Sequence, residues 1–435
     1  MFYYSTNAQA PLATLKKAVQ KGLAEDRGLY MPQRLPSLSA QFLGSMKNLS
    51  LSEIGFQVAR AFFGEDVEET ALRRIVDETL CFPIPLREVE KNIYALELFH
   101  GPTLAFKDVG ARFMARMLQY FRHAEGDGRT VNVLVATSGD TGSAVANGFL
   151  GVEGVRVFVL YPKGGVSPIQ ECQFTTLGKN ITAIEVDGVF DDCQALVKSA
   201  FMDAELNQHM VLTSANSINV ARFLPQSFYY FHAIAQLQQL GFDGNEVVCC
   251  VPSGNFGNLC SALFGHKMGL PMKRFIAANN ENDTFFRYLQ SGVYEPKHSV
   301  ATIANAMDVG DPSNFARIYE LYGKDVDAIR ANISALRYSD EEISETMCQC
   351  MQQTGYILDP HGACGYRALK ESLRKDEVGF FLETAHPAKF RDTVQRITSH
   401  EVPIPERLQA FMQGTKQSIA CQKDFEAFKD LLLRT

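Results

Sequence analysis

Lys107 is the residue whose surroundings most favour covalent chemistry. It lies in residues 100–114, where its nearest neighbours are mostly apolar or aromatic, namely Leu104, Ala105, Phe106, Val109 and Phe113. Burial among such side chains disfavours the ammonium form of a lysine and lowers its pKa, as an amine needs in order to condense with a carbonyl. The position alone also fits a surface lysine at the start of a helix, with Asp108 and Arg112 paired one turn apart.

Two loops rich in glycine and small polar residues could each hold an anion. Residues 136–144 and residues 252–258 each follow an apolar, strand-like run and precede an apolar helical segment. This arrangement leaves backbone N–H groups free at the start of a helix, where the partial positive charge favours a phosphate or a carboxylate. A single loop of this kind often only reverses the chain, but two in one chain favour anion binding.

Several common cofactor and catalytic motifs are absent from the sequence. There is no Gly-x-Gly-x-x-Gly dinucleotide fingerprint and no Gly-Lys-Ser/Thr phosphate loop, which disfavours NAD and P-loop nucleotides. The simplest zinc-protease and serine-hydrolase motifs are also missing, and no metal site is expected. Structural or site-wall roles are favoured for the histidines in loops flanked by glycine or proline, namely His100, His361 and His386.

The composition is that of an ordinary globular protein with room for a large core. The chain has 435 residues, 46% of them hydrophobic, and a formal net charge of −7 with its basic residues scattered. These features argue against nucleic acid and anionic membranes as partners. No secretory signal is visible at the N-terminus and the longest apolar runs have only the length of a strand, so a cytoplasmic protein is expected.

The hydrophobic pattern divides the chain into two parts. Residues 1–82 are mainly helical, with amphipathic segments at residues 12–22, 52–63 and 67–80. In residues 83–435, short β-branched runs alternate with amphipathic helices, which indicates an α/β architecture with a parallel sheet. The runs that precede helical segments are residues 131–136, 155–160, 181–186, 247–251 and 275–278.

Five segments, taken together and in order, resemble the threonine synthase family. They are residues 100–114, 138–142, 214–222, 253–258 and 384–390, and further similarity at residues 3–6 and 28–32 extends the resemblance over nearly the whole chain. The family consists of pyridoxal 5′-phosphate (PLP) enzymes of the tryptophan synthase β-like fold, or fold type II. The resemblance implies a two-lobed α/β enzyme with parallel or mixed sheets, a mostly helical N-terminal domain, and a mobile smaller lobe at about residues 108–240.

The resemblance also implies roles for residues at matching positions. Lys107 corresponds to the lysine that forms a Schiff base with the cofactor, and Thr384 to the hydroxyl residue that faces the pyridine nitrogen. The cofactor phosphate is expected to bind the loop formed by Gly254, Asn255, Phe256, Gly257 and Asn258. The substrate phosphate is expected to bind Ser138, Thr141, Asn216 and Arg222.

Asp140 departs from related PLP enzymes of this fold, in which an asparagine at this position meets the ring hydroxyl of the cofactor. A carboxylate beside a substrate phosphate would repel it unless the carboxylate were protonated or paired. We therefore expect Asp140 to cap the following helix through backbone N–H groups.

The implied reaction converts O-phospho-L-homoserine and water to L-threonine and inorganic phosphate, with Lys107 moving protons at Cα and Cβ of the substrate. A phosphorylated cofactor and a phosphorylated substrate would account for two anion-binding loops. The alternatives are a related phospho-lyase that releases 2-oxobutyrate and a non-catalytic PLP-binding protein. A monomer or a homodimer is expected.

Overall fold

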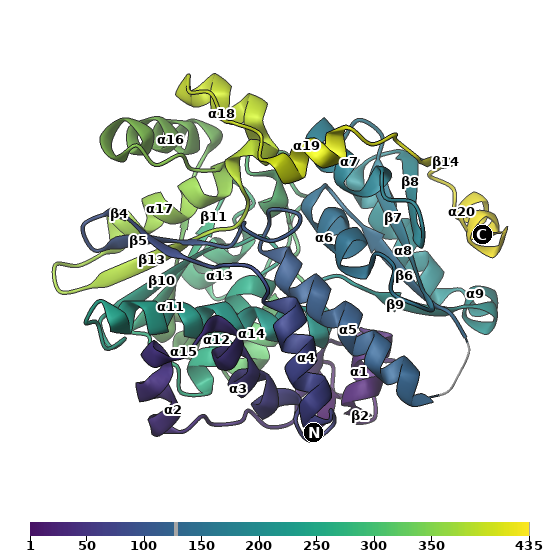
Figure 1. Ribbon diagram of the computed structural model, residues 1–435, viewed down its shortest axis with the longest axis horizontal. Helices are drawn as coiled ribbons and strands as arrows, with labels where there is room; N and C mark the ends of the chain where they lie inside the picture. The colour runs from purple at the N-terminus through teal and green to yellow at the C-terminus, as the bar shows by residue number, and fades with distance from the viewer. Residues whose placement is uncertain (126–128, 435) are drawn as a thin grey trace.

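The N-terminal part of the computed structural model combines helices with a small antiparallel sheet (Figure 1). The structure describes residues 1–125 and 129–434. The helices here are α1 (Leu15–Lys21), α2 (Ala40–Ser45), α3 (Leu51–Phe63) and α4 (Glu69–Thr79). The sheet has the order β2-β1-β3 and consists of β1 (Phe2–Ser5), β2 (Ala13–Thr14) and β3 (Tyr30–Pro32). The sequence predicted three of these helices but not the sheet, because such short strands show no clear alternation.

A six-stranded mixed sheet lies at the centre of the larger part of the molecule. Its order is β12-β11-β10-β13-β5-β4, and only the β4-β5 pair at one edge is antiparallel. The strands are β4 (Leu86–Glu90), β5 (Ile93–Glu97), β10 (Val247–Pro252), β11 (Arg274–Asn279), β12 (Ile333–Arg337) and β13 (Val378–Glu383).

Both faces of this sheet are buried, which explains the continuous apolar runs in its strands. Cys249 of β10 belongs to the core formed with α11 (Ser227–Gln239) and α12 (Gly257–Lys267). Its neighbour Cys250 points into the opposite core, formed with α16 (Asp340–Thr354) and α17 (Pro360–Ser372). The prediction of an α/β fold with a buried, mostly parallel sheet is confirmed.

A second, five-stranded parallel sheet has the order β14-β8-β7-β6-β9. Its strands are β6 (Val131–Ala136), β7 (Val155–Pro162), β8 (Ile181–Asp187), β9 (Val211–Ser214) and β14 (Ile419–Gln422). The helices around it are α5 (Lys107–Glu125), α6 (Asp140–Phe149), α7 (Pro168–Thr175), α8 (Phe190–Met202), α9 (Ala204–His209) and α20 (Phe425–Arg434). The first four of these strands lie within the range expected for the smaller lobe.

The C-terminal segment connects the two sheets. After β13, the chain passes through α18 (Arg391–Thr398) and α19 (Glu406–Met412) to β14, which pairs with β8, and to α20, which packs on α8. In Figure 1 this yellow segment runs across the top of the molecule from one group of strands to the other. The range of about residues 108–240 did not include these elements, because β14 is a short and mostly exposed strand with little hydrophobic signal.

The segments singled out in the sequence lie just beyond the carboxyl ends of strands, where ligands bind in open parallel sheets. The loop with Ser138 follows β6, Asn216 follows β9, the loop with Gly254 follows β10, and Thr384 follows β13. Within residues 1–125 and 129–434, no helix is both long and apolar enough to cross a membrane.

Candidate active site

Lys107 is the first residue of α5 and lies beside the end of β13. The preceding residues pair with the segment after β13: the Phe106 N–H donates to the Thr384 carbonyl oxygen at 2.9 Å, and the His386 N–H donates to the Leu104 carbonyl oxygen at 3.0 Å. Leu104 has a positive φ of 58° within this bridge. The pairing brings together Lys107 and Thr384, the residues expected to meet the cofactor at its aldehyde and at its pyridine nitrogen.

The environment of Lys107 is that of a buried amine among charges. Only 16% of its side chain is exposed, and its Nζ lies 3.9 Å from Asp140 Oδ2. Burial lowers the pKa of Lys107; Asp140 opposes this effect, whereas the positive charges of Lys389 and Arg222 add to it. The interpretation as an exposed surface lysine is therefore wrong.

Asp108 and Arg112 have different partners, so their spacing in the sequence does not reflect a simple ion pair. Asp108 is buried and accepts hydrogen bonds from the Thr103 N–H at 2.9 Å and the Thr103 hydroxyl at 2.6 Å. Arg112 donates to the Glu78 carbonyl oxygen at 2.7 Å. The Asp108 contacts fix the turn that leads into Lys107.

The loop between β10 and α12 has the geometry of an anion-binding helix N-terminus. Phe256 adopts a left-handed conformation with φ 61° at the N-cap position of α12, and no side chain caps the helix there. A Cβ atom at Gly254 would lie 2.7 Å from Met307 Cα, and one at Gly257 would lie 2.8 Å from Ser217 Cβ. The backbone is therefore closely packed at this loop, which leads into a helix N-terminus without a side-chain cap, an arrangement that favours an anion.

Asn255 and Asn258 anchor this loop through their side chains. Asn255 donates from Nδ2 to Ser217 Oγ at 2.9 Å and accepts the Ser313 N–H at 2.6 Å. Asn258 Oδ1 accepts the hydroxyls of Tyr229 at 2.5 Å and Tyr230 at 2.7 Å, whereas its Nδ2 is buried without a partner among the described residues. The unpartnered amide is a donor available to a ligand.

We expect Asn258→Ala to lower the free energy of unfolding by about 2 kcal/mol, because two buried tyrosine hydroxyls would lose their shared acceptor. Urea unfolding of the cofactor-free protein measures this change. Asn258→Asp is the matched control: it keeps the acceptor oxygen but adds a negative charge beside the expected phosphate, so it should preserve stability better and bind PLP more weakly. Wild-type stability of Asn258→Ala would contradict the assigned hydrogen bonds.

The residues expected at the substrate phosphate come from two segments. Ser138 and Thr141 lie at the start of α6, where Thr137 Oγ1 accepts the N–H groups of Gly139 at 2.9 Å and Gly142 at 2.8 Å. Asn216 lies in the other segment, after β9, and its Oδ1 is buried without a partner among the described residues. This oxygen and the α6 N-terminus are polar groups that a ligand can meet.

Arg222 lies in the second segment, in the short helix α10 (Val220–Phe223), and is 1% exposed. It donates from Nη1 to the Ala215 carbonyl oxygen, and its Nε has no partner among the described residues. Burial lowers the pKa of Arg222 to about 10, against the attraction of Asp108. The guanidinium is thus a buried cation with donor capacity left over.

Asp140 does not cap α6, so the prediction of a helix cap is wrong. The N-cap position is Gly139, with a φ of 138°, and the side chain that accepts an N–H of this helix start is that of Thr137. Asp140 instead pairs with the buried Lys389, whose Nζ lies 2.6 Å from Oδ1, and accepts a hydrogen bond from Gln170 at 2.9 Å. Although burial alone would raise it, the pKa of Asp140 is held well below its usual value, chiefly by the charges of Lys389 and Lys107.

Lys389 and Gln170 were not identified as site residues from the sequence. Lys389 also donates to the Thr103 carbonyl oxygen at 2.9 Å, so it links the segment before Lys107 to the start of α6. The sequence signal for Lys389 was that a lysine lies between Ala388 and Phe390, in residues 384–390, one of the five segments that resemble the threonine synthase family. Pairing it with Asp140 requires the folded chain.

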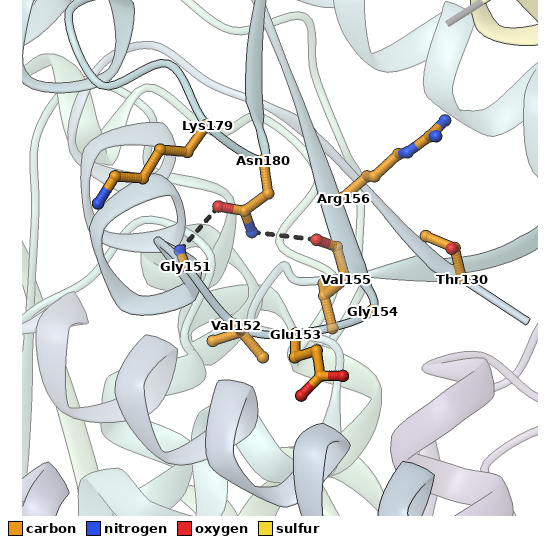
Figure 2. Close-up of a pocket in the computed structure, with 9 residues that line it drawn as sticks. All are labelled: Thr130, Gly151, Val152, Glu153, Gly154, Val155, Arg156, Lys179 and Asn180. Carbon is orange, nitrogen blue, oxygen red and sulfur yellow. Dashed lines mark hydrogen bonds between the residues drawn. The ribbon is translucent and has the colours of Figure 1, made fainter. Parts of the chain in front are cut away.

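A surface hollow of about 340 Å³ lies elsewhere on the five-stranded sheet (Figure 2). Its walls come from the segments before β7 and β8, at the amino ends of the strands, opposite to the loop with Ser138. Asn180 accepts the Gly151 N–H at 2.7 Å and donates to the Val155 carbonyl oxygen at 3.0 Å, as Figure 2 shows. These contacts fix the connections between strands, and the hollow is not part of the site around Lys107.

The residues around Lys107 fit PLP. A buried lysine with a lowered pKa suits the aldehyde, and the uncapped N-terminus of α12 and the free Asn258 Nδ2 suit the phosphate. Thr384, at the strand end next to Lys107, suits the ring nitrogen. Among the described residues, no group of three or more His, Cys, Asp or Glu side chains is placed to hold a metal ion.

Comparison with known families and structures agrees with this arrangement. The model "Threonine synthase N terminus" matches residues 2–80, "Pyridoxal-phosphate dependent enzyme" matches residues 75–382, and "Threonine synthase, C-terminal" matches residues 362–432. The chain belongs to the threonine synthase family. Threonine synthase of Haemophilus influenzae is 45% identical over 435 residues, with 100% of each chain covered.

Solved structures from the threonine synthase family are also similar over the full length. The crystal structure of threonine synthase from Escherichia coli has a TM-score of 0.93 at 42% identity, with 100% of both chains covered. PLP-bound threonine synthase from Brucella melitensis has a TM-score of 0.94 at 35% identity, covering 100% of this chain and 99% of that one. Membership of the threonine synthase family confirms the predicted fold type, cofactor and enzyme class.

Proposed function

We propose that the protein converts O-phospho-L-homoserine and water to L-threonine and inorganic phosphate at the site around Lys107. The observation that supports this site is that the start of α6 lies beside a buried amine, while the loop before α12 is hydrogen-bonded to the segment that carries Asn216 and Arg222. Asp140, at the start of α6, lies 3.9 Å from Lys107 Nζ. The loop before α12 contacts the segment after β9, because Asn255 donates a hydrogen bond to Ser217. Two anion-binding helix N-termini linked through the segment after β9 suit a phosphorylated cofactor and a phosphorylated substrate.

We assign to Lys107 the covalent attachment of PLP and the movement of protons at Cα and Cβ of the substrate. Burial supports this role because a neutral amine can accept a proton, and the charges of Lys389 and Arg222 also favour the neutral form. PLP, when bound, supplies an electron sink for charge that develops on the substrate carbon. Thr384 would meet the pyridine nitrogen with a hydroxyl, which favours a largely unprotonated ring nitrogen.

We assign the two phosphates to different loops. Residues 254–258 would hold the cofactor phosphate, because their helix N-terminus has no side-chain cap and their glycines allow close backbone approach. Ser138, Thr141, Asn216 and Arg222 would hold the substrate phosphate. The pairing of Asp140 with Lys389 supports this second assignment, since a neutralised carboxylate does not repel an incoming dianion.

We also propose the division of the chain into residues 1–82 and 83–435, with a smaller lobe of about residues 108–240. The five-stranded sheet supports the smaller lobe, and β14 and α20 add to it from the C-terminal segment. Motion of this lobe would control when water reaches the substrate, because water must add at Cβ only after phosphate has left.

Product analysis tests the reaction. The PLP-loaded protein is incubated with O-phospho-L-homoserine, and threonine, phosphate and 2-oxobutyrate are quantified over time. Threonine and phosphate in equal amounts are expected. Release of 2-oxobutyrate without threonine would show the phospho-lyase instead, and release of no product would show a PLP-binding protein without turnover.

Arg222→Ala is expected to raise KM for O-phospho-L-homoserine about 10- to 100-fold, because the substrate phosphate loses charge-assisted hydrogen bonds. PLP should remain bound, as measured by its absorbance after gel filtration. Arg222→Lys, which keeps the charge but not the planar pair of donors, should give an intermediate KM. Loss of PLP at unchanged KM would mean that the two phosphate sites are assigned the wrong way round.

A further inference from the structure

His361, the second residue of α17, is a buried histidine to which the proposed reaction assigns no role. Its Nε2 accepts the Ala306 N–H at 3.1 Å, and its Nδ1 lies 2.6 Å from Asp359 Oδ1. Because a backbone amide can only donate, Nε2 carries no proton, and the ring proton lies on Nδ1, which donates to Asp359. Both ring nitrogens are therefore engaged, and the imidazole is held in one orientation.

Asp359 holds the other side of this ring, and Glu383 lies next to Asp359. Asp359 Oδ1 also accepts the His361 backbone N–H at 2.6 Å, which fixes the start of α17. Burial, and then the charge of Asp359, raise the pKa of Glu383 well above its usual value, which favours the protonated form that donates to Asp359. A Cβ atom at Gly362 would lie 2.2 Å from Glu383 Oε1, so α17 sits directly on this carboxyl group. Glu383 ends β13, immediately before Thr384.

Ala306 belongs to a short 3-10 helix, η3 (Asn305–Met307), that lies against the loop before α12. A Cβ atom at Gly254 would lie 2.7 Å from Met307 Cα and 3.0 Å from the Ala306 carbonyl oxygen. On its far side η3 is followed by Asp308, which accepts hydrogen bonds from Asn280 Nδ2 at 2.8 Å and from the Thr302 N–H at 3.0 Å. The 3-10 helix is thus held between Asp308 and His361, with its backbone against Gly254.

We propose that His361 is a positioning residue for the cofactor phosphate: held by Asp359, it fixes η3 against Gly254 and so sets the shape of the phosphate loop. This inference rests on the proposed assignment of residues 254–258 to the cofactor phosphate. The network also joins the two ends of the cofactor site, because Glu383 adjoins Thr384 and η3 adjoins Gly254.

Replacing His361 by glutamine or by asparagine tests its Nε2 and Nδ1 hydrogen bonds one at a time. In His361→Gln the side-chain amide reaches the place of Nε2 and can accept the Ala306 N–H, whereas in His361→Asn it reaches only the place of Nδ1. The dissociation constants of PLP and of pyridoxal, which lacks the phosphate, are measured by absorbance titration of the cofactor-free proteins. We expect His361→Asn to bind PLP about tenfold more weakly and His361→Gln within about threefold of wild type. Pyridoxal affinity should change little in either variant.

Hydrogen exchange and a second variant complete the test. In the wild-type, cofactor-free protein, the amide of Ala306 should exchange slowly, and it should exchange faster in His361→Asn.

Gly254→Ala tests the phosphate site itself, because its Cβ would collide with Met307. If Gly254→Ala weakens PLP binding but His361→Asn does not, the role of His361 is overturned and the phosphate site stands. If Gly254→Ala leaves PLP affinity unchanged, the phosphate-site assignment fails. An equal loss of PLP and pyridoxal affinity in His361→Asn, or a rapidly exchanging Ala306 amide in wild type, would also overturn the proposal.

Discussion

Lys107→Ala is expected to reduce turnover of O-phospho-L-homoserine by at least about 10⁴-fold, because the chain would lose its attachment point for PLP and a positioned proton carrier in one substitution. Steady-state kinetics measure the loss of turnover. Borohydride reduction of the PLP-loaded protein, followed by peptide mapping, locates the residue to which PLP is attached. In wild type the label should lie on the peptide that contains Lys107. In Lys107→Ala the label should be absent, and the absorbance band of the attached cofactor should disappear.

Two other lysines control this experiment. Lys163 is exposed, so Lys163→Ala should keep both label and activity. Lys389 is the other buried amine near Asp140, and a label on its peptide would show that the attachment point has been placed on the wrong lysine. A label on any other residue would equally contradict the assignment.

Lys389→Met is expected to lower the free energy of unfolding by about 3–5 kcal/mol, because it leaves the carboxylate of Asp140 buried without its main partner. It should also raise the pKa of Lys107, since a neighbouring positive charge is lost and Asp140 becomes free to attract the ammonium form. Because Lys107 becomes a free amine only in the enzyme–substrate complex, the rising limb of the pH profile of kcat should therefore move to higher pH. Denaturant unfolding and steady-state kinetics over a pH series measure the two effects.

The double variant Lys389→Met with Asp140→Asn isolates the ion pair from other effects. Because the carboxylate and the lysine that neutralises it are removed together, the double variant should be more stable than Lys389→Met alone. Strictly additive losses, or a Lys389→Met protein with wild-type stability and an unshifted pH profile, would show that this ion pair does not control the site.

The parts of the site that could be predicted are those that depend on residues close together in the sequence. Lys107 has an apolar local environment, and each anion-binding loop has its glycines and the start of its helix within a few residues. The α/β fold followed from the strand-like runs, because a strand buried on both faces is apolar along its whole length. In these cases the signal and the structure that it predicts lie in the same segment.

The parts that could not be predicted depend on contacts between distant segments. Asp140 has a side chain typical of a helix cap. Only the folded structure shows that its carboxylate forms an ion pair with Lys389 instead. In the same way, His361 was expected to have a structural or site-wall role, but its contact with Ala306 depends on how α17 packs beside η3. The strands β2 and β14 are too short to be seen by periodicity and are defined by the partners with which they pair.

The position of β14 has a consequence for synthesis on the ribosome. Among the described strands it is the last to be made, yet it pairs with β8, which is made much earlier. During translation β8 therefore leaves one row of backbone groups uncovered until the final segment emerges, and such an edge can pair with another nascent chain. Chains cut short before β14 should accordingly be the aggregation-prone forms of this protein.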